Sequence, residues 1–416
     1  MLFDDAKRRR SLYPVFLTYF LDNFGMAIIY PIFTPLFLKA SHSILAYATP
    51  YFERTVLLGL VIGAFPLAQF FGSSIIGQFS DKFGRKRAFY ITILGTALGY
   101  TITAVSIMEG SFLWLFISRF FTGLFAGNQP LCLAAVADMS PDDTSRTKNF
   151  GQIGAIGGLS FIAAIAFGGI LSNPGISKHF NPSFPFWITA ALSYLNFAAM
   201  IYFFHETHPS QKHPGMNPFK GFSNLLEGIR NTELRIIYVV NFLFMLSWVA
   251  SMQFLPSFLL EHFKCDIGSI TICLMIIGAL WSLTNLFLNP QFAKRFFPGK
   301  TLLISLFIIS LLLLCVLFAP IPSIFLSLFF PAVCCASLCW TNGLAAVSLK
   351  APSAIQGSIL GINQSMSSIA AMLSPVIGGV LFGLNDHAVY FFSGLVTLCA
   401  FVLLLTTKTY HSHSYD

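Results

Sequence analysis

GQFSDKFGRKRA, residues 77–88, follows directly on an uncharged run from Leu57 to Ile76. Wound as a helix with a rise of about 1.5 Å per residue, that run is long enough to cross a bilayer core of about 30 Å. One acid and four bases crowd the segment behind it, and its glycines, Gly77 and Gly84, permit a tight reversal of the chain. The segment therefore predicts a short, basic connection on the water side of two membrane-spanning helices.

The composition of the whole chain agrees with a membrane protein. Of 416 residues, 10% are charged and 56% are hydrophobic, and the mean hydropathy is +0.74, whereas soluble proteins have about 25% charged residues. The uncharged or nearly uncharged runs are 11–38, 57–76, 88–108, 111–137, 150–177, 180–204, 236–260, 267–293, 301–349, 351–385 and 388–407. Pro320 and Pro322 divide the longest run in two, because proline ends helices. The sequence thus predicts an all-α polytopic membrane protein with twelve transmembrane helices.

The basic residues are distributed unevenly across the predicted membrane. Of the 24 Lys and Arg residues, most fall in loops on the side of the N-terminal cluster Lys7–Arg10. The opposite side holds four, Lys39, Arg54, Lys178 and Lys264. Because basic residues concentrate on the cytoplasmic side, both termini are expected there. The net charge of +8 then needs no nucleic-acid partner.

Cysteine and histidine give no indication of a metal or a cofactor. Seven of the eight cysteines fall within predicted spans and only Cys265 lies in an outer loop, so no disulfide framework is expected. His205, His208 and His213 are spaced irregularly around prolines, which is more typical of a solvated linker than of a metal site. We expect no metal and no cofactor.

The chain repeats itself at about half its length. Residues 78–83 resemble residues 291–296, and Gly168-Gly169 is matched by Gly378-Gly379. This repeat predicts two pseudo-symmetric six-helix halves, 1–204 and 236–416. The polar segment 205–235 between them is predicted to be a cytoplasmic linker that carries a short interfacial helix.

Two ionisable residues lie inside predicted spans, Asp22 in the first and Arg119 in the fourth. Such groups are costly in a membrane and are therefore usually functional. Thr18, Asp22 and Gly25 share one helical face. A carboxylate there can bind a proton, and a conformational change that alters its access to water can load and unload it. The alternative is that Asp22 is locked to Arg119 or capped by its neighbours, and that Arg119 only holds helices together.

The pattern G-x-x-x-D-[RK]-x-G-[RK]-[RK] in residues 77–86 resembles the signature loop between helices 2 and 3 of the major facilitator superfamily. Helix 1, LDNFGMAIIYPIF, with ADMSPDDTSRTKNFG and IQGSILG further along, most resembles bacterial tetracycline:proton and related drug:proton antiporters. Arg119, Gly123 and Gly127 resemble the superfamily's helix 4 motif. The resemblance implies proton-coupled transport of a small amphipathic molecule by alternating access, with export by antiport and Asp22 and Arg119 in proton coupling.

The resemblance also assigns a gating loop on the cytoplasmic side. Its residues are Gly77, Asp81, Gly84, Arg85, Lys86 and Asp138. Acid–base contacts there can latch one conformation. One departure from the antiporter pattern is that Ala164 and Ile165 stand shortly before Gly168-Gly169, where a Gly-Pro pair is usual. An importer of a nutrient or siderophore-like compound by symport is therefore the alternative.

Other polar and aromatic side chains within the spans are candidates for the wall of a substrate cavity. They are Asn23, Gln69, Asn128, Gln129, Asn241, Trp248, Trp281, Asn285, Trp340, Asn363 and Gln364. Amides beside indole rings suit a planar or amphipathic ligand. For each of them, the alternative is a hydrogen bond between helices.

An enzyme is not expected. The sequence has no HExxH, GxSxG or P-loop motif and no appended soluble domain, so an intramembrane enzyme or a polytopic sensor is only a remote alternative. The expected partners are a small-molecule substrate, protons and membrane lipid. A bundle with its own cavity can work as a monomer.

Overall fold

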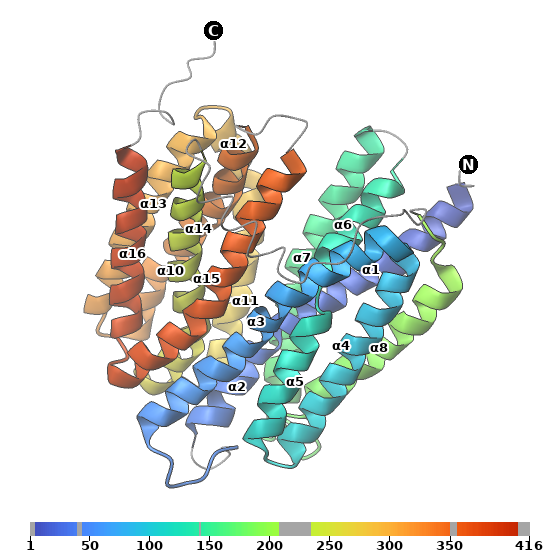
Figure 1. The fold of residues 1–416 in the computed structure, drawn as a ribbon. Helices are drawn as coiled ribbons and strands as arrows, with labels where there is room; N and C mark the ends of the chain where they lie inside the picture. Colours follow the sequence, from blue (N-terminus) through green and yellow to red (C-terminus); the bar gives the residue numbers. More distant parts are fainter. Residues whose placement is uncertain (1–4, 40–43, 141–142, 208–233, 350–355, 407–416) are drawn as a thin grey trace. The chain divides into compact units, whose positions relative to one another are not determined.

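A computed structural model describes residues 5–39, 44–140, 143–207, 234–349 and 356–406 (Figure 1). Its helices are α1 (Asp5–Ala27), α2 (Ile29–Leu38), α3 (Tyr51–Phe83), α4 (Arg85–Met108), α5 (Phe112–Phe125), α6 (Asn128–Asp138), α7 (Asp143–Leu171), α8 (Phe184–Phe203), α10 (Arg235–Glu261), α11 (Ile267–Leu283), the π-helix η2 (Thr284–Leu288), α12 (Asn289–Ala293), α13 (Pro298–Cys315), the 3-10 turn η3 (Val316–Phe318), α14 (Pro322–Leu349), α15 (Gln356–Leu384) and α16 (Ala388–Leu405). Within the described ranges, twelve helical segments are long and apolar enough to cross a membrane. The predicted all-α, twelve-span fold is confirmed.

The chain forms two compact units. The first comprises Met1–Ala48 and Ala64–Lys220, and the second Thr49–Gly63 and Gly221–Asp416. The first part of α3 thus belongs with the second unit. The boundaries drawn from the sequence at 204 and 236 stay a prediction, and the expected interfacial helix falls in 208–233, outside the described residues.

In the first unit, α4 packs against α5 and α8, and α1 packs against α6, α7 and α8. Their apolar side chains meet in a core that includes Val15, Phe89, Leu131 and Met200, each at most 4% exposed. This core holds α1, α4, α6 and α8 as one block, and the residues around Asp22 described below lie on the same four helices.

In the second unit, α10 packs against α15 and α16, and α13 packs against α14 and α16. Small polar residues join these helices. Ser374 donates a hydrogen bond to the carbonyl of Leu246 at 2.8 Å, and Ser393 donates one to the carbonyl of Ser247 at 3.0 Å. Such contacts are typical of membrane bundles, where small side chains let helix backbones approach closely.

The fourth span is not one helix, contrary to the sequence-based expectation. Helix α5 ends at Phe125 and α6 begins at Asn128. Pro130 has no N–H to donate to the carbonyl of Ala126, and Gln69 donates its side-chain amide to that carbonyl instead, at 2.7 Å. The helix therefore breaks at Ala126 and Gly127.

The turn at residues 77–88 is also shorter than predicted. Helix α3 continues through Gly77, which has open space beside it, and ends at Phe83. Only Gly84, with φ of 96°, adopts a backbone conformation that other residues rarely reach. The reversal between the second and third spans thus rests on one glycine, and the prediction that Gly77 helps to make it is wrong.

Candidate functional site

The carboxylate of Asp22 is buried and accepts a hydrogen bond from the side-chain amide of Asn128, with 3.0 Å between Nδ2 and Oδ1. Asp22 is 8% exposed and Asn128 is 2% exposed. Asn128 is the first residue of α6, so the break in the fourth span sets where its amide points. The side-chain amide of Gln129, the next residue, donates a hydrogen bond to the side-chain oxygen of Asn23 at 3.0 Å. This is a second hydrogen bond between α6 and α1.

A cavity of about 10 Å³ lies beside Asp22, enough for about one water molecule. It is lined by Thr18, Leu21, Asp22, Ile93, Thr96, Tyr100, Asn128, Ser193 and Asn196. Asn196 donates to the hydroxyl of Thr18 at 2.8 Å, so α8 is tied to α1 next to the carboxylate. The carboxylate is therefore surrounded mainly by neutral polar groups.

Four polar lining residues escaped the sequence analysis, namely Thr96, Tyr100, Ser193 and Asn196. Their spacings, four residues on α4 and three on α8, place each pair on one helical face. Polar residues repeated at that spacing within an apolar run were the available signal. The hydroxyl of Tyr100 also lies where a side chain at Gly25 would be, which explains why α1 carries a glycine there.

Arg119 is fully buried, and none of its three guanidinium nitrogens has a hydrogen-bond partner among the described residues. The guanidinium lies over the rings of Phe65 and Phe33, at 4.7 and 5.8 Å from their centroids. These cation–π contacts offset only part of the cost of burying a charge. The described residues show no ion pair between Arg119 and Asp22, which was one of the alternatives drawn from the sequence.

Among the described residues, two acids contact the basic loop. Arg85 forms an ion pair with Asp138 at 3.3 Å and donates to the hydroxyl of Ser80 at 2.7 Å. The carboxylate of Glu206 accepts the backbone N–H groups of Arg85 and Lys86, at 2.9 and 3.0 Å. The side chain of Asp81 lies outside the described part of the structure.

Glu206 was missed by the sequence analysis, although an acid directly after the sixth span was a visible signal. Its carboxylate sits at the N-terminus of α4, where the helix dipole and the free N–H groups favour negative charge. Glu206 thus ties the start of the segment 205–235 to the basic loop.

In the second unit, the predicted residues join neighbouring helices. Asn241 on α10 donates to Asn363 on α15 at 2.9 Å and to the carbonyl of Gly343 on α14 at 3.2 Å. Asn285 accepts from Thr341 at 2.6 Å. These amides make the interhelical hydrogen bonds that the sequence analysis gave as the alternative to ligand contact.

The indole rings of the second unit form a stack. Trp248 stacks on Trp281 with 6.0 Å between ring centroids and on Phe329 with 5.9 Å. Trp340 is half-buried, and Gln364 is exposed on α15. The structure therefore gathers Trp248 and Trp281 into one aromatic stack, which among the described residues includes neither Trp340 nor Gln364.

Twelve apolar helices and a buried, intramembrane carboxylate define an integral membrane transporter. The chain belongs to the Major Facilitator Superfamily, whose family profile matches residues 15–327 and 237–415. The fold and the family together exclude an enzyme, since members of this superfamily are transporters.

Several known proteins resemble the chain over nearly its full length. A tetracycline resistance protein of class H from Pasteurella multocida is 25% identical over 97% of this chain and 96% of its own. The crystal structure of the human organic anion transporter MFSD10 (TETRAN) has a TM-score of 0.69 at 20% identity and covers 95% of this chain and 99% of its own. A crystal structure of a D-xylose-proton symporter has a TM-score of 0.76 at 12% identity, with 95% and 97% covered. The two structures establish the fold.

Proposed function

We propose that this transporter exports a small amphipathic molecule in exchange for protons. It works by alternating access in a bacterial inner membrane, as a monomer with both termini in the cytoplasm. The observation that carries the proposal is the buried carboxylate of Asp22, hydrogen-bonded to Asn128 beside a cavity for about one water molecule.

The first argument concerns the charge of Asp22. Its hydrogen-bond partner, Asn128, is a neutral amide, and no cation among the described residues forms an ion pair with it. A buried carboxylate without a counter-charge is costly when ionised. Binding a proton therefore changes the relative free energies of the bundle's conformations. That change of charge is what couples a proton gradient to a conformational change.

The second argument concerns the cytoplasmic side. The Arg85–Asp138 ion pair, with side chains 12% and 25% exposed, and the exposed Glu206 contact with α4 are both accessible to water, and each contributes little alone. Weak contacts suit a latch that must open in every transport cycle. We assign Gly84, Arg85, Lys86 and Asp138 to this latch, with Asp81 as a further candidate.

The third argument concerns the substrate. The tetracycline resistance relative covers nearly the whole chain, and tetracycline is a planar, amphipathic molecule. The Trp248–Trp281 stack in the second unit offers an aromatic surface for such a ligand. Asn241, in the same unit, remains a candidate for a polar contact to it.

The test is transport in proteoliposomes that contain a pH-sensitive dye, with tetracycline and D-xylose as the first probes. We expect tetracycline to move against protons in the wild type and expect Asp22→Asn to abolish the coupled flux. Glu109→Gln, an exposed acid at the end of α4, is the matched control and should transport normally.

The outcomes separate the alternatives. Proton movement in the same direction as the substrate would make the protein a symporting importer. Substrate flux without proton movement would reduce Asp22 to a structural residue. Flux that requires sodium instead of a proton gradient would refute proton coupling.

A further inference from the structure

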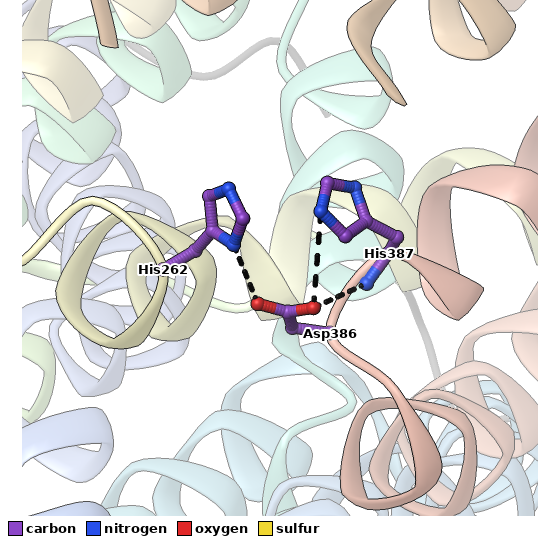
Figure 2. Close-up of side chains that lie close together, drawn as sticks. All are labelled: His262, Asp386 and His387. Atoms are coloured by element: carbon purple, nitrogen blue, oxygen red, sulfur yellow. Dashed lines mark hydrogen bonds and ion pairs between the residues drawn. The ribbon is translucent and has the colours of Figure 1, made fainter. Parts of the chain in front are cut away.

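Three potential metal ligands meet at one end of the second unit. His262 directly follows the last residue of α10, and Asp386 and His387 lie in the turn between α15 and α16 (Figure 2). All three belong to the second unit and lie outside the membrane-spanning segments.

The ligand atoms lie close enough for one ion. His262 Nδ1 is 2.7 Å from Asp386 Oδ2, His387 Nε2 is 4.0 Å from Asp386 Oδ1, and all three ligand atoms lie within 4.8 Å of one another. Around a tetrahedral zinc ion with bonds of about 2.1 Å, ligands lie about 3.4 Å apart. Side-chain rotations that move the ligand atoms by about an ångström therefore convert this cluster into a coordination site.

The two imidazole rings are held in place by aromatic packing. Phe258 stacks on His262 with 4.7 Å between centroids and meets the edge of His387 at 5.4 Å. The backbone N–H of His387 donates to Asp386 Oδ1 at 2.9 Å, which fixes the turn that carries both residues. Supporting contacts of this kind orient metal ligands before the metal arrives.

The cluster is open to solvent on one side. The side chains of His262, Asp386 and His387 are 29%, 29% and 33% exposed, so an ion can reach them. Two imidazoles and one carboxylate are borderline ligands, which favour zinc or a similar transition-metal ion over magnesium or calcium. Three protein ligands leave the fourth tetrahedral position to water.

We propose that His262, Asp386 and His387 bind one divalent transition-metal ion of the zinc class. The ion joins the end of α10 to the turn between α15 and α16. It thereby restrains the ends of three helices of the second unit.

The test is zinc binding by the full chain, purified in detergent and stripped of metal with a chelator. After equilibrium dialysis against zinc, the wild type should hold one more zinc ion per chain than His262→Gln or His387→Gln. The difference matters because the chain has nine histidines, some of which can bind zinc elsewhere. His179→Gln changes an exposed histidine of the first unit, is the matched control, and should bind as much as the wild type.

One further variant and a second readout distinguish loss of the metal site from misfolding. Asp386→Asn keeps the shape of the side chain but loses its charge, and it should weaken zinc binding at least tenfold. Cobalt should give the wild type a visible absorption band that both histidine variants lack and that excess magnesium does not reduce. Equal zinc counts in the wild type and in all three variants, or a cobalt spectrum that His262→Gln and His387→Gln leave unchanged, would overturn the proposal.

Discussion

Asn128 donates a hydrogen bond to Asp22 at 3.0 Å, between residues that are 106 positions apart in the chain. The contact exists because Pro130 breaks the fourth span, so that a new helix begins at Asn128 with its amide directed at α1. A neutral donor satisfies one carboxylate oxygen without cancelling its charge. Asp22 thus keeps the freedom to change its protonation state.

We first predict that Asn128→Leu impairs proton-coupled transport. A hydrogen bond to a charged group contributes about 1.5–3 kcal/mol, so its loss corresponds to about a tenfold or larger reduction in rate. Gln129→Leu is the control, because that amide contacts Asn23 and not the carboxylate. Proteoliposome flux that is equally affected in both variants would show that the Asn128 contact has no special role.

Arg119→Met should make the protein more stable and inactive. The guanidinium is buried without a hydrogen-bond partner among the described residues, and an apolar side chain of similar size avoids the cost of burying that charge. We expect the melting temperature in detergent to rise by several degrees while coupled transport is lost. A gain in stability with loss of activity is the behaviour of a functional residue rather than a structural one.

The control for Arg119 is Arg54→Met. Arg54 is also buried, at 4% exposed, but its Nε donates to the carbonyl of Thr49 at 2.9 Å. Its removal should lower the melting temperature. If Arg119→Met is destabilising to the same degree, Arg119 is a structural residue.

Glu206→Ala should destabilise the first turn of α4. The carboxylate accepts two backbone N–H groups at the N-terminus of that helix, and loss of such a cap costs about 1 kcal/mol. Amide hydrogen exchange at Arg85 and Lys86 should become faster. Glu109→Ala, at the opposite end of the same helix, should leave both amides unchanged, because an acid at a helix C-terminus gains nothing from the dipole.

Cys265 should react slowly with a membrane-impermeant maleimide added to intact cells. Burial, and then the charge of Asp266, raises the pKa of its thiol, so less of the reactive thiolate is present at neutral pH. Hydrogen bonds from Ser269 lower the pKa of Asp266, so this charge persists across the pH range of the experiment. The labelling rate should continue to increase with pH even above the ordinary pKa of a cysteine thiol.

Asp266→Asn should speed this labelling about twofold at neutral pH, because it removes the charge but keeps a side chain that can cap α11. Cys265→Ser should remove the signal. Labelling only after the cells are opened would reverse the predicted orientation, with the termini outside.

The sequence analysis predicted the fold well because the membrane constrains each helix locally. Span lengths follow from the bilayer, and the prolines at 320 and 322 marked the division between α13 and α14. It was wrong about where the helix of the second span ends. Glycine is common in turns, yet α3 continues through Gly77 and the chain reverses only at Gly84.

The candidate site was predicted in part. Asp22 and Arg119 were visible because charge inside an apolar run is rare, but their partners were not visible. Thr96, Tyr100, Ser193 and Asn196 are ordinary polar residues of membrane helices, and nothing in their composition marks them as neighbours of Asp22. Glu206 likewise becomes meaningful only when its segment meets the start of α4.

By itself, the sequence determined that this chain has twelve apolar spans with one carboxylate in the first, since apolar length and isolated charge are local properties, and its motifs indicated the transporter family. Only the tertiary structure decided that Asp22 contacts Asn128 and that His262 meets Asp386. Such pairs depend on the rotation and offset of helices about their axes. Those quantities are set by side-chain packing across the whole unit, which no single segment encodes.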